Sequence, residues 1–127
     1  MELNSHGVNK AIKAYILSDE GMRSAGFRII KGDNQRLDYW YYYCLLKLPE
    51  PYSKSEISFS VSIPIDKSDI RIDVLDEDFL QPYDYQHYLE NIPYHTFAGF
   101  VKLAVEKQLE RLQDLEILSG HKYGDYI

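Results

Sequence analysis

The clearest pattern along the chain is an alternation of apolar and polar residues between Glu56 and Ile65. Alternation with a period of two residues is typical of a β-strand that buries one face, so a strand is predicted here. The proline at position 64 suits the end of a strand or an edge strand. The apolar members are Ile57, Phe59, Val61, Ile63 and Ile65, and the polar members are Ser58, Ser60 and Ser62.

Three further segments predict strands around this one. The segment from Ile70 to Val74 alternates again, now with charged residues between the apolar ones. The segment from Leu37 to Leu48 is a nearly continuous run of aromatic and aliphatic residues. The turn-like sequence from Gly32 to Gln35 precedes it, so we expect a hairpin with a strand from Gly26 to Lys31. The four strands predict an antiparallel meander.

A helix is predicted before the sheet, from Asn4 or Ser5 to about Ser18. Apolar residues recur there at spacings of three and four, as they do on the buried face of a helix. Gly21 is the expected stop. The apolar residues of this segment are Val8, Ala11, Ile12 and Tyr15.

Two helices are predicted after the sheet. A short one ends near Asn91, and a long amphipathic one runs from Thr96 to about Leu118, with Gly120 as its stop. The apolar stripe of the long helix is expected to be Phe97, Phe100, Val101, Ala104, Leu109, Leu112 and Leu115. The residues expected largely on its opposite face are Lys102, Glu106, Lys107, Glu110, Arg111 and Asp114.

These elements predict a single α+β domain over residues 1–127. Its order is an N-terminal helix, a four-stranded antiparallel meander sheet, a short helix and a long C-terminal helix. The apolar face of the sheet needs a cover, and the N-terminal and long C-terminal helices are the segments able to provide it. We therefore expect both to pack on one face of the sheet. No repeat or linker divides the chain.

The strand from Leu37 to Leu48 divides its side chains into two sets. Tryptophan, cysteine and leucine are buried more often than lysine, so the even-numbered set is expected to face the helices. A shift of one residue would exchange the two faces. The even-numbered set is Trp40, Tyr42, Cys44, Leu46 and Leu48; the odd-numbered set is Tyr39, Tyr41, Tyr43, Leu45 and Lys47.

Tyrosine is unusually frequent, with twelve in the chain. It supplies a large contact area with a polar tip, and it is enriched at protein interfaces. On the predicted register, Tyr39, Tyr41 and Tyr43 form a stripe on the outer face of the sheet, which is a candidate binding surface. The alternative is that these tyrosines are ordinary cross-strand pairs with solvated hydroxyls.

The amino-acid composition indicates where the protein is located and which classes of partner it can bind. The net charge is −6, and the basic residues are scattered, so no nucleic-acid partner is expected. An acidic surface instead permits a basic partner, and the alternative is that this charge serves solubility alone. No apolar run is long enough for a membrane span, and the N-terminus does not resemble a signal peptide. Cys44 is the single cysteine, which fits a reducing compartment, so a cytoplasmic location without a membrane partner is expected.

The chain shows no motif for cofactor or metal chemistry. There is no glycine-rich phosphate loop, and the four histidines have no partners at metal-ligand spacing, so no cofactor or metal is expected. Cys44 is predicted to face the core, where a nucleophilic role is disfavoured. One segment mixes aromatic and titratable residues and is a second candidate binding region. Its members are Tyr83, Asp84, Tyr85, His87 and His95.

Three hypotheses for function follow. The first is a non-enzymatic protein-interaction module of accessory, immunity or inhibitor type, which presents an acidic, tyrosine-rich surface. The alternative is a small-ligand binder or small enzyme with a pocket between sheet and helices around Tyr83 and His95. The third is a homodimer that buries the tyrosine face against a second copy. The tail from Gly120 to Ile127 either docks on the domain or serves as a recognition peptide.

Overall fold

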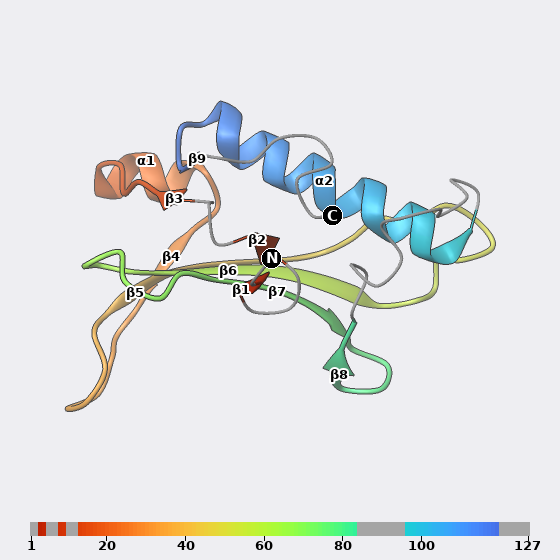
Figure 1. The fold of residues 1–127 in the computed structure, drawn as a ribbon, viewed down its shortest axis with the longest axis horizontal. Coiled ribbons are helices and arrows are strands. Elements are labelled where there is room, and N and C mark those ends of the chain that lie inside the picture. The colour runs from red at the N-terminus through yellow and green to blue at the C-terminus, as the bar shows by residue number, and fades with distance from the viewer. Residues whose placement is uncertain (1–2, 5–7, 10–12, 84–95, 120–127) are drawn as a thin grey trace.

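The structure is a computed structural model that describes residues 3–4, 8–9, 13–83 and 96–119. Among these residues, five consecutive strands form one antiparallel sheet, ordered as they follow along the chain. Figure 1 shows this sheet as one layer, with the helices α1 and α2 on the same side of it. The strands are β4 (Arg28–Ile30), β5 (Tyr39–Leu45), β6 (Ile57–Pro64), β7 (Arg71–Asp76) and β8 (Gln81–Pro82).

Strand β6 lies at the centre of the sheet and follows the predicted alternation. Val61 lies opposite Tyr42 on β5 and opposite Ile72 on β7. Residues that are opposite one another in a sheet point to the same face, so the apolar side chains of neighbouring strands meet on one side. The β6 residues in this core are Ile57, Phe59, Val61 and Ile63, all essentially buried.

Helix α2 (Phe97–Asp114) covers that side of the sheet. It begins where the sequence predicts, because the Thr96 side chain accepts a hydrogen bond from the Gly99 N–H at 3.1 Å. Its apolar stripe is buried in the same core as the β6 side chains. Burying each such side chain stabilises the fold by about 1.5–3 kcal/mol relative to leaving it exposed. The large apolar residues of α2 that are fully buried are Val101, Val105, Leu109 and Leu112.

Residues in and directly after α2 depart from the predicted amphipathic pattern. Val105 lies outside the predicted stripe, yet it is fully buried. Glu106 is expected on the polar face, yet only 1% of it is exposed. Helical geometry places it about 60° around the axis from Leu109, at the flank of the buried stripe rather than opposite it. Leu115 is expected in the stripe, but it is the C-cap residue and is exposed, because it lies past the last turn of the helix.

The end of α2 is also earlier than predicted. The helix ends at Asp114, and Glu116 adopts a left-handed conformation with φ of 64°. The Glu116 N–H then bonds to the Gln113 carbonyl at 2.9 Å, and the Ile117 N–H bonds to the Leu112 carbonyl at 3.0 Å. This is the Schellman arrangement, usually formed with glycine at the left-handed position. Because a glutamate occupies that position here, the sequence carries no stop signal before Gly120.

The predicted N-terminal helix is wrong over the part that the structure describes. Lys13–Ala14 forms a short strand, β3, which pairs with Leu118–Ser119, named β9. The Tyr15 N–H extends this pairing by donating to the Ile117 carbonyl at 2.7 Å. A partner strand more than a hundred positions away overrides the local helical spacing. Two further strands, β1 (Leu3–Asn4) and β2 (Val8–Asn9), pair with each other.

Helix α1 (Asp19–Ser24) begins where the N-terminal helix was expected to end. Ser18 caps it by accepting a hydrogen bond from the Gly21 N–H at 3.1 Å, so Gly21 lies inside the helix instead of stopping it. Gly26, with φ of 101°, provides the left-handed residue that ends α1. The short segment therefore contains its own start and stop signals.

The α+β class and the antiparallel sheet are confirmed, but the sheet has a fifth strand. Strand β8 contains only two residues, one of them proline, and its pairing with β7 leaves no periodic signal in the sequence. The predicted short helix before Asn91 lies outside the described residues.

The left-handed residue at the end of α2 predicts that a glycine substitution there and one inside the helix change stability in opposite directions. Replacing Glu116 with glycine should raise the free energy of unfolding by about 1 kcal/mol, since glycine adopts this conformation without a Cβ penalty. The same replacement at Glu110, exposed inside the helix, should lower it by about 1 kcal/mol. Urea unfolding followed by circular dichroism measures both. A loss of stability in Glu116→Gly would contradict this helix end.

Candidate functional site

Strand β5 divides its side chains between the two faces of the sheet as predicted. Trp40 is buried beneath the helices, and the Tyr42 hydroxyl donates a hydrogen bond to Gln108 Oε1 of α2 at 2.9 Å. Leu46 and Leu48 are buried as well. The odd-numbered residues must therefore point to the opposite face, which α1 and α2 do not cover (Figure 1). We call this the open face, and Tyr39, Tyr41 and Tyr43 on it the tyrosine stripe.

The open face can be mapped from the strand register. One row across four strands is formed by Arg28, Tyr41, Ser62 and Arg71. In the neighbouring rows, Tyr43 lies opposite Ser60, and Ser60 lies opposite Asp73. The small serines of β6 thus separate the stripe from the longer side chains of β7. The remaining open-face positions by register are Ile30, Tyr39, Leu45, Ser58, Pro64, Leu75 and Pro82.

The tyrosine stripe is held by ring contacts and one hydrogen bond. The rings of Tyr39 and Tyr41 meet edge to face, with centroids 6.4 Å apart. The Arg28 guanidinium lies 5.7 Å from the centroid of the Tyr41 ring, within the range of a cation–π contact. The Tyr43 hydroxyl donates to Glu77 Oε1 at 3.0 Å. The stripe is therefore ordered by neighbours on three different elements.

Tyr43 is the most open member of the stripe. It is 47% exposed, while Tyr39 and Tyr41 are half-buried. Burial raises the pKa of its hydroxyl, and the hydrogen bond to the Glu77 carboxylate raises it further. Tyr43 thus remains a neutral hydrogen-bond donor at neutral pH. Leu45 continues the stripe and is 50% exposed.

Hollows lie on both sides of the stripe. One, of about 520 Å³, is lined by Gly26, Arg28, Tyr41 and Tyr43. Another, of about 550 Å³, lies at the end of the stripe, where Tyr39 and Arg71 flank Ser62. In Figure 1 the loop from β4 to β5 and the turn from β7 to β8 both extend to this side of the sheet. The tyrosines therefore form a ridge on a face bounded at its two ends.

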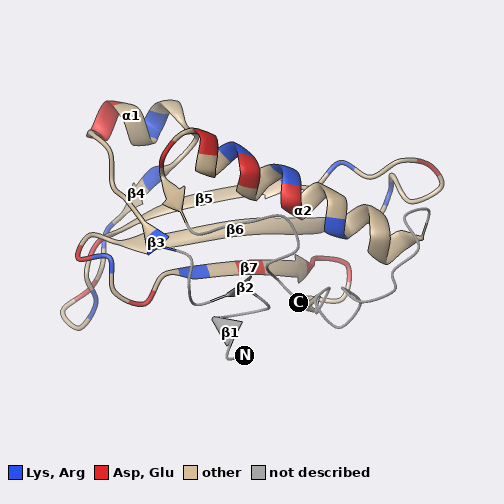
Figure 2. Ribbon diagram, turned by 45° about the horizontal axis from the view of Figure 1, so that its top comes forward, with Lys and Arg blue, Asp and Glu red and all other residues tan. Residues whose placement is uncertain are grey.

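The charges beside the stripe are of both signs. The charged residues that the register places on the open face are Arg28, Arg71 and Asp73, and the last two lie 3.8 Å apart. Glu77 and Asp78 lie in the turn after β7, which is red in Figure 2, and the figure shows further acidic residues on α1, on α2 and in other loops. The acidic turn therefore borders the tyrosine stripe and contacts it through the hydrogen bond between Tyr43 and Glu77.

The second candidate region can be placed only at its start. Tyr83 is half-buried, its N–H donates to the Val74 carbonyl at 2.9 Å, and its ring centroid lies 5.7 Å from that of Phe97. It belongs to the packing between β8 and α2. Asp84, Tyr85, His87 and His95 lie outside the described residues, and so does the tail from Gly120 to Ile127. The predicted pocket between Tyr83 and His95 stays a prediction.

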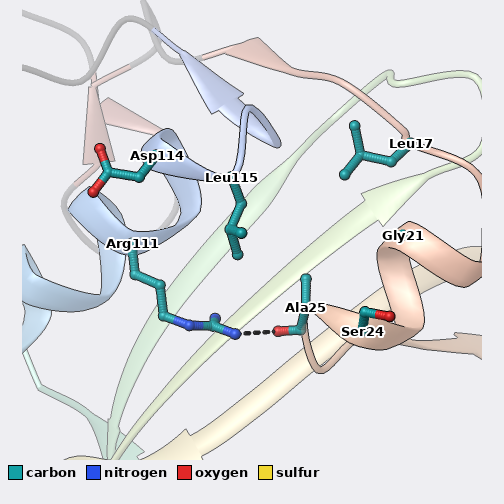
Figure 3. A pocket seen from close by; sticks show the side chains of 7 residues that line it. All are labelled: Leu17, Gly21, Ser24, Ala25, Arg111, Asp114 and Leu115. Atoms are coloured by element: carbon teal, nitrogen blue, oxygen red, sulfur yellow. Dashed lines mark hydrogen bonds between the residues drawn. The ribbon is translucent and has the colours of Figure 1, made fainter.

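A hollow of about 320 Å³ between α1 and the end of α2 was not expected from the sequence. Figure 3 shows Arg111 reaching across to α1, where Nη2 donates to the Ala25 carbonyl at 2.7 Å. Its guanidinium also lies 5.6 Å from the Tyr42 ring centroid. Leu17 and Leu115 lie on either side of the opening. These contacts fasten α1 to α2, and their residues come from distant segments with no shared motif.

Cys44 is half-buried within β5. Burial raises the pKa of its thiol, so the reactive thiolate is disfavoured at neutral pH. In the part of the chain that the structure describes, no three side chains form a metal-binding group. No helix there is long and apolar enough to cross a membrane.

Comparison with known proteins bears on the fold alone. No protein-family model matches the chain, and no curated protein matches it. The structure is similar to the crystal structure of a DUF1831 family protein from Lactobacillus plantarum, with a TM-score of 0.56. The two chains share 11% sequence identity, and the match covers 94% of this chain and 98% of that chain. This likeness supports the α+β architecture over nearly the whole length of both chains.

The contact between Tyr42 and α2 predicts a dependence of stability on alkaline pH. Burial, followed by the neighbouring Cys44 side chain, raises the pKa of Tyr42 to about 12 from the usual value of 10. The folded state keeps this proton where the unfolded chain loses it. The resulting stability is therefore complete below pH 10 and is lost as the pH rises from 10 to 12.

Tyr42→Phe should make that alkaline loss shallower and should remove one tyrosinate step near pH 12 from the absorbance titration of the folded protein. Urea unfolding at several pH values measures the first effect, with the wild type as the reference. An identical pH profile in the two proteins would show that Tyr42 ionises normally.

Proposed function

We propose that this protein is a non-enzymatic protein-interaction module and that the open face of its sheet is the contact surface. The observation that carries this proposal is the tyrosine stripe together with Leu45. These side chains are placed on the face opposite both described helices, so packing against α1 and α2 does not account for their size. An uncovered run of large aromatic side chains bordered by polar groups is typical of a binding surface.

The composition of this face also supports the proposal. Tyrosine and arginine are the residues that most often carry the binding energy of protein interfaces, and here Arg28 and Arg71 border the stripe. The stripe lies on β5, which is paired on both sides. Side chains on a paired strand lose little further freedom on binding, so the cost of ordering the interface is small.

The charges of the open face indicate which partner it would bind. Arg28 and Arg71 lie at the two ends of one row, with Tyr41 between them. A partner protein that offers carboxylates at these ends and apolar groups between them would be complementary to this row. A second copy of the chain is the competing occupant.

The test introduces charge into the stripe. Tyr41→Glu and Tyr43→Glu should each reduce recovery of a stoichiometric partner from cell extract at least tenfold, because an unpaired carboxylate would be buried in the contact. Tyr15→Glu is the matched control, since Tyr15 is 48% exposed and lies away from the open face. Thermal unfolding establishes that all three variants are folded.

Two outcomes would reject the proposal. One is equal recovery of the partner with the stripe variants and with Tyr15→Glu. The other is a wild-type protein that forms dimers in sedimentation velocity while both stripe variants are monomers, which would identify a second copy as the occupant.

A further inference from the structure

The turn between β7 and β8 presents two large apolar side chains to solvent. Phe79 is 74% exposed and Leu80 is 78% exposed, the highest values among the large hydrophobic residues that the structure describes. They follow Glu77 and Asp78 in the four-residue connection between the strands. We call Phe79 and Leu80 the hairpin tip. In Figure 1 this turn extends away from the sheet beside the label of β8.

The turn that carries the hairpin tip is held in place by hydrogen bonds. Asp76 Oδ1 accepts hydrogen bonds from the N–H groups of Asp78 and Phe79, at 3.0 and 3.3 Å. Asp78 Oδ2 accepts one from the Glu56 N–H at 3.1 Å, and the Glu77 N–H donates to the Glu56 carbonyl at 2.8 Å. The turn is thus anchored to the start of β6. Its two apolar side chains are presented on an ordered support.

Folding does not explain the choice of residues at the hairpin tip. Leu80 has φ of 52°, in the left-handed region where a bulky side chain is strained and glycine is favoured. It also remains exposed, so its side chain contributes little burial to offset that strain. A solvent-exposed phenylalanine beside it adds a second large apolar group at the same point. A role in binding would account for both residues.

We propose that the hairpin tip inserts into an apolar pocket with a basic rim on a partner protein. The charge of the surrounding residues defines the rim, since the carboxylates of Glu56, Asp76, Glu77 and Asp78 lie around the turn. Within the described part of the chain, none of the four forms an ion pair with a lysine or arginine. A lysine- or arginine-bearing pocket would complement this collar, and a carboxylate collar would be repelled by an anionic lipid surface.

The hairpin tip borders the open face but shares no residue with the tyrosine stripe, and the inference holds whether or not the stripe binds a partner. The two surfaces meet where the Tyr43 hydroxyl bonds to Glu77. The variants for the test are therefore chosen away from that contact, so that each surface can fail alone.

The probe is a synthetic amphipathic peptide of leucine and lysine, and a peptide of leucine and glutamate is its matched control. In ¹H–¹⁵N correlation spectra of the labelled full chain, the leucine–lysine peptide should shift the amide signals of Phe79 and Leu80 in a saturable way. The shifts should weaken with added salt, because the charges involved are exposed. The leucine–glutamate peptide should leave these signals unchanged.

Substitutions at the hairpin tip separate lost contact from lost folding. Phe79→Ser combined with Leu80→Ser should weaken the peptide affinity at least tenfold. Leu80→Gly should also weaken it, while the urea midpoint stays equal or rises, because glycine relieves the left-handed strain. Ile65→Ser is the control: Ile65 is similarly apolar and exposed beside the acidic Asp66, and its loss should leave the affinity unchanged.

Several results would overturn the inference. Equal shifts with both peptides, no shift at the hairpin tip, or unchanged affinity in Leu80→Gly would each do so. Concentration-dependent shifts of the tip without peptide would identify a second copy as its occupant instead. Tyr41→Glu should leave peptide binding intact, so failure of the open-face proposal and failure of this one can be told apart.

Discussion

The structure depends on the packing of α2 against one face of the sheet, with β6 at its centre. Every large apolar side chain of β6 points to that face, where Phe59 and Val61 meet the stripe of α2 that contains Val105 and Leu109. Because side chains alternate strictly along a strand, the residues of β6 between these apolar ones point to the opposite face of the sheet. On β6 those residues are three serines and Pro64. The position of α2 thus also defines which surface stays uncovered.

The pairing with β6 also determines which side chains of the neighbouring strand β5 face the helices. β5 is paired with β6 over its full length, so its even-numbered residues join the core and its tyrosines join the serines. Because serine side chains are small, the tyrosine rings of β5 project further from the sheet than the neighbouring β6 side chains do. The Arg28 guanidinium lies over the Tyr41 ring. An aromatic ridge on a rigid, paired strand is suited to binding, whereas Cys44 on the inner face is not suited to chemistry.

Sequence reasoning succeeded where the structural signal was local. The alternation in β6 and β7 and the amphipathic spacing of α2 identified these elements, because each pattern depends on neighbouring residues. It failed where a distant segment decided the outcome. The helical spacing around Tyr15 lost to a backbone pairing with Ile117, and the end of α2 was hidden because Glu116 adopts a conformation that usually requires glycine. The fifth strand was missed for a related reason, since two residues carry no period.

The sequence by itself determined which residues of β5 share a face, because side chains alternate with a period of two along a strand. Which of the two faces packs against the helices was decided by the tertiary structure, since a shift of one residue would exchange them, and the burial of Trp40 leaves the tyrosines on the opposite face. Only the tertiary structure decided which charges border the tyrosines, since Arg28 and Arg71 reach that row through strand pairing. It also decided that Phe79 and Leu80 stay exposed at a hairpin tip while Glu106 is buried. Burial depends on what packs above a residue, and residue type and local spacing do not contain that information.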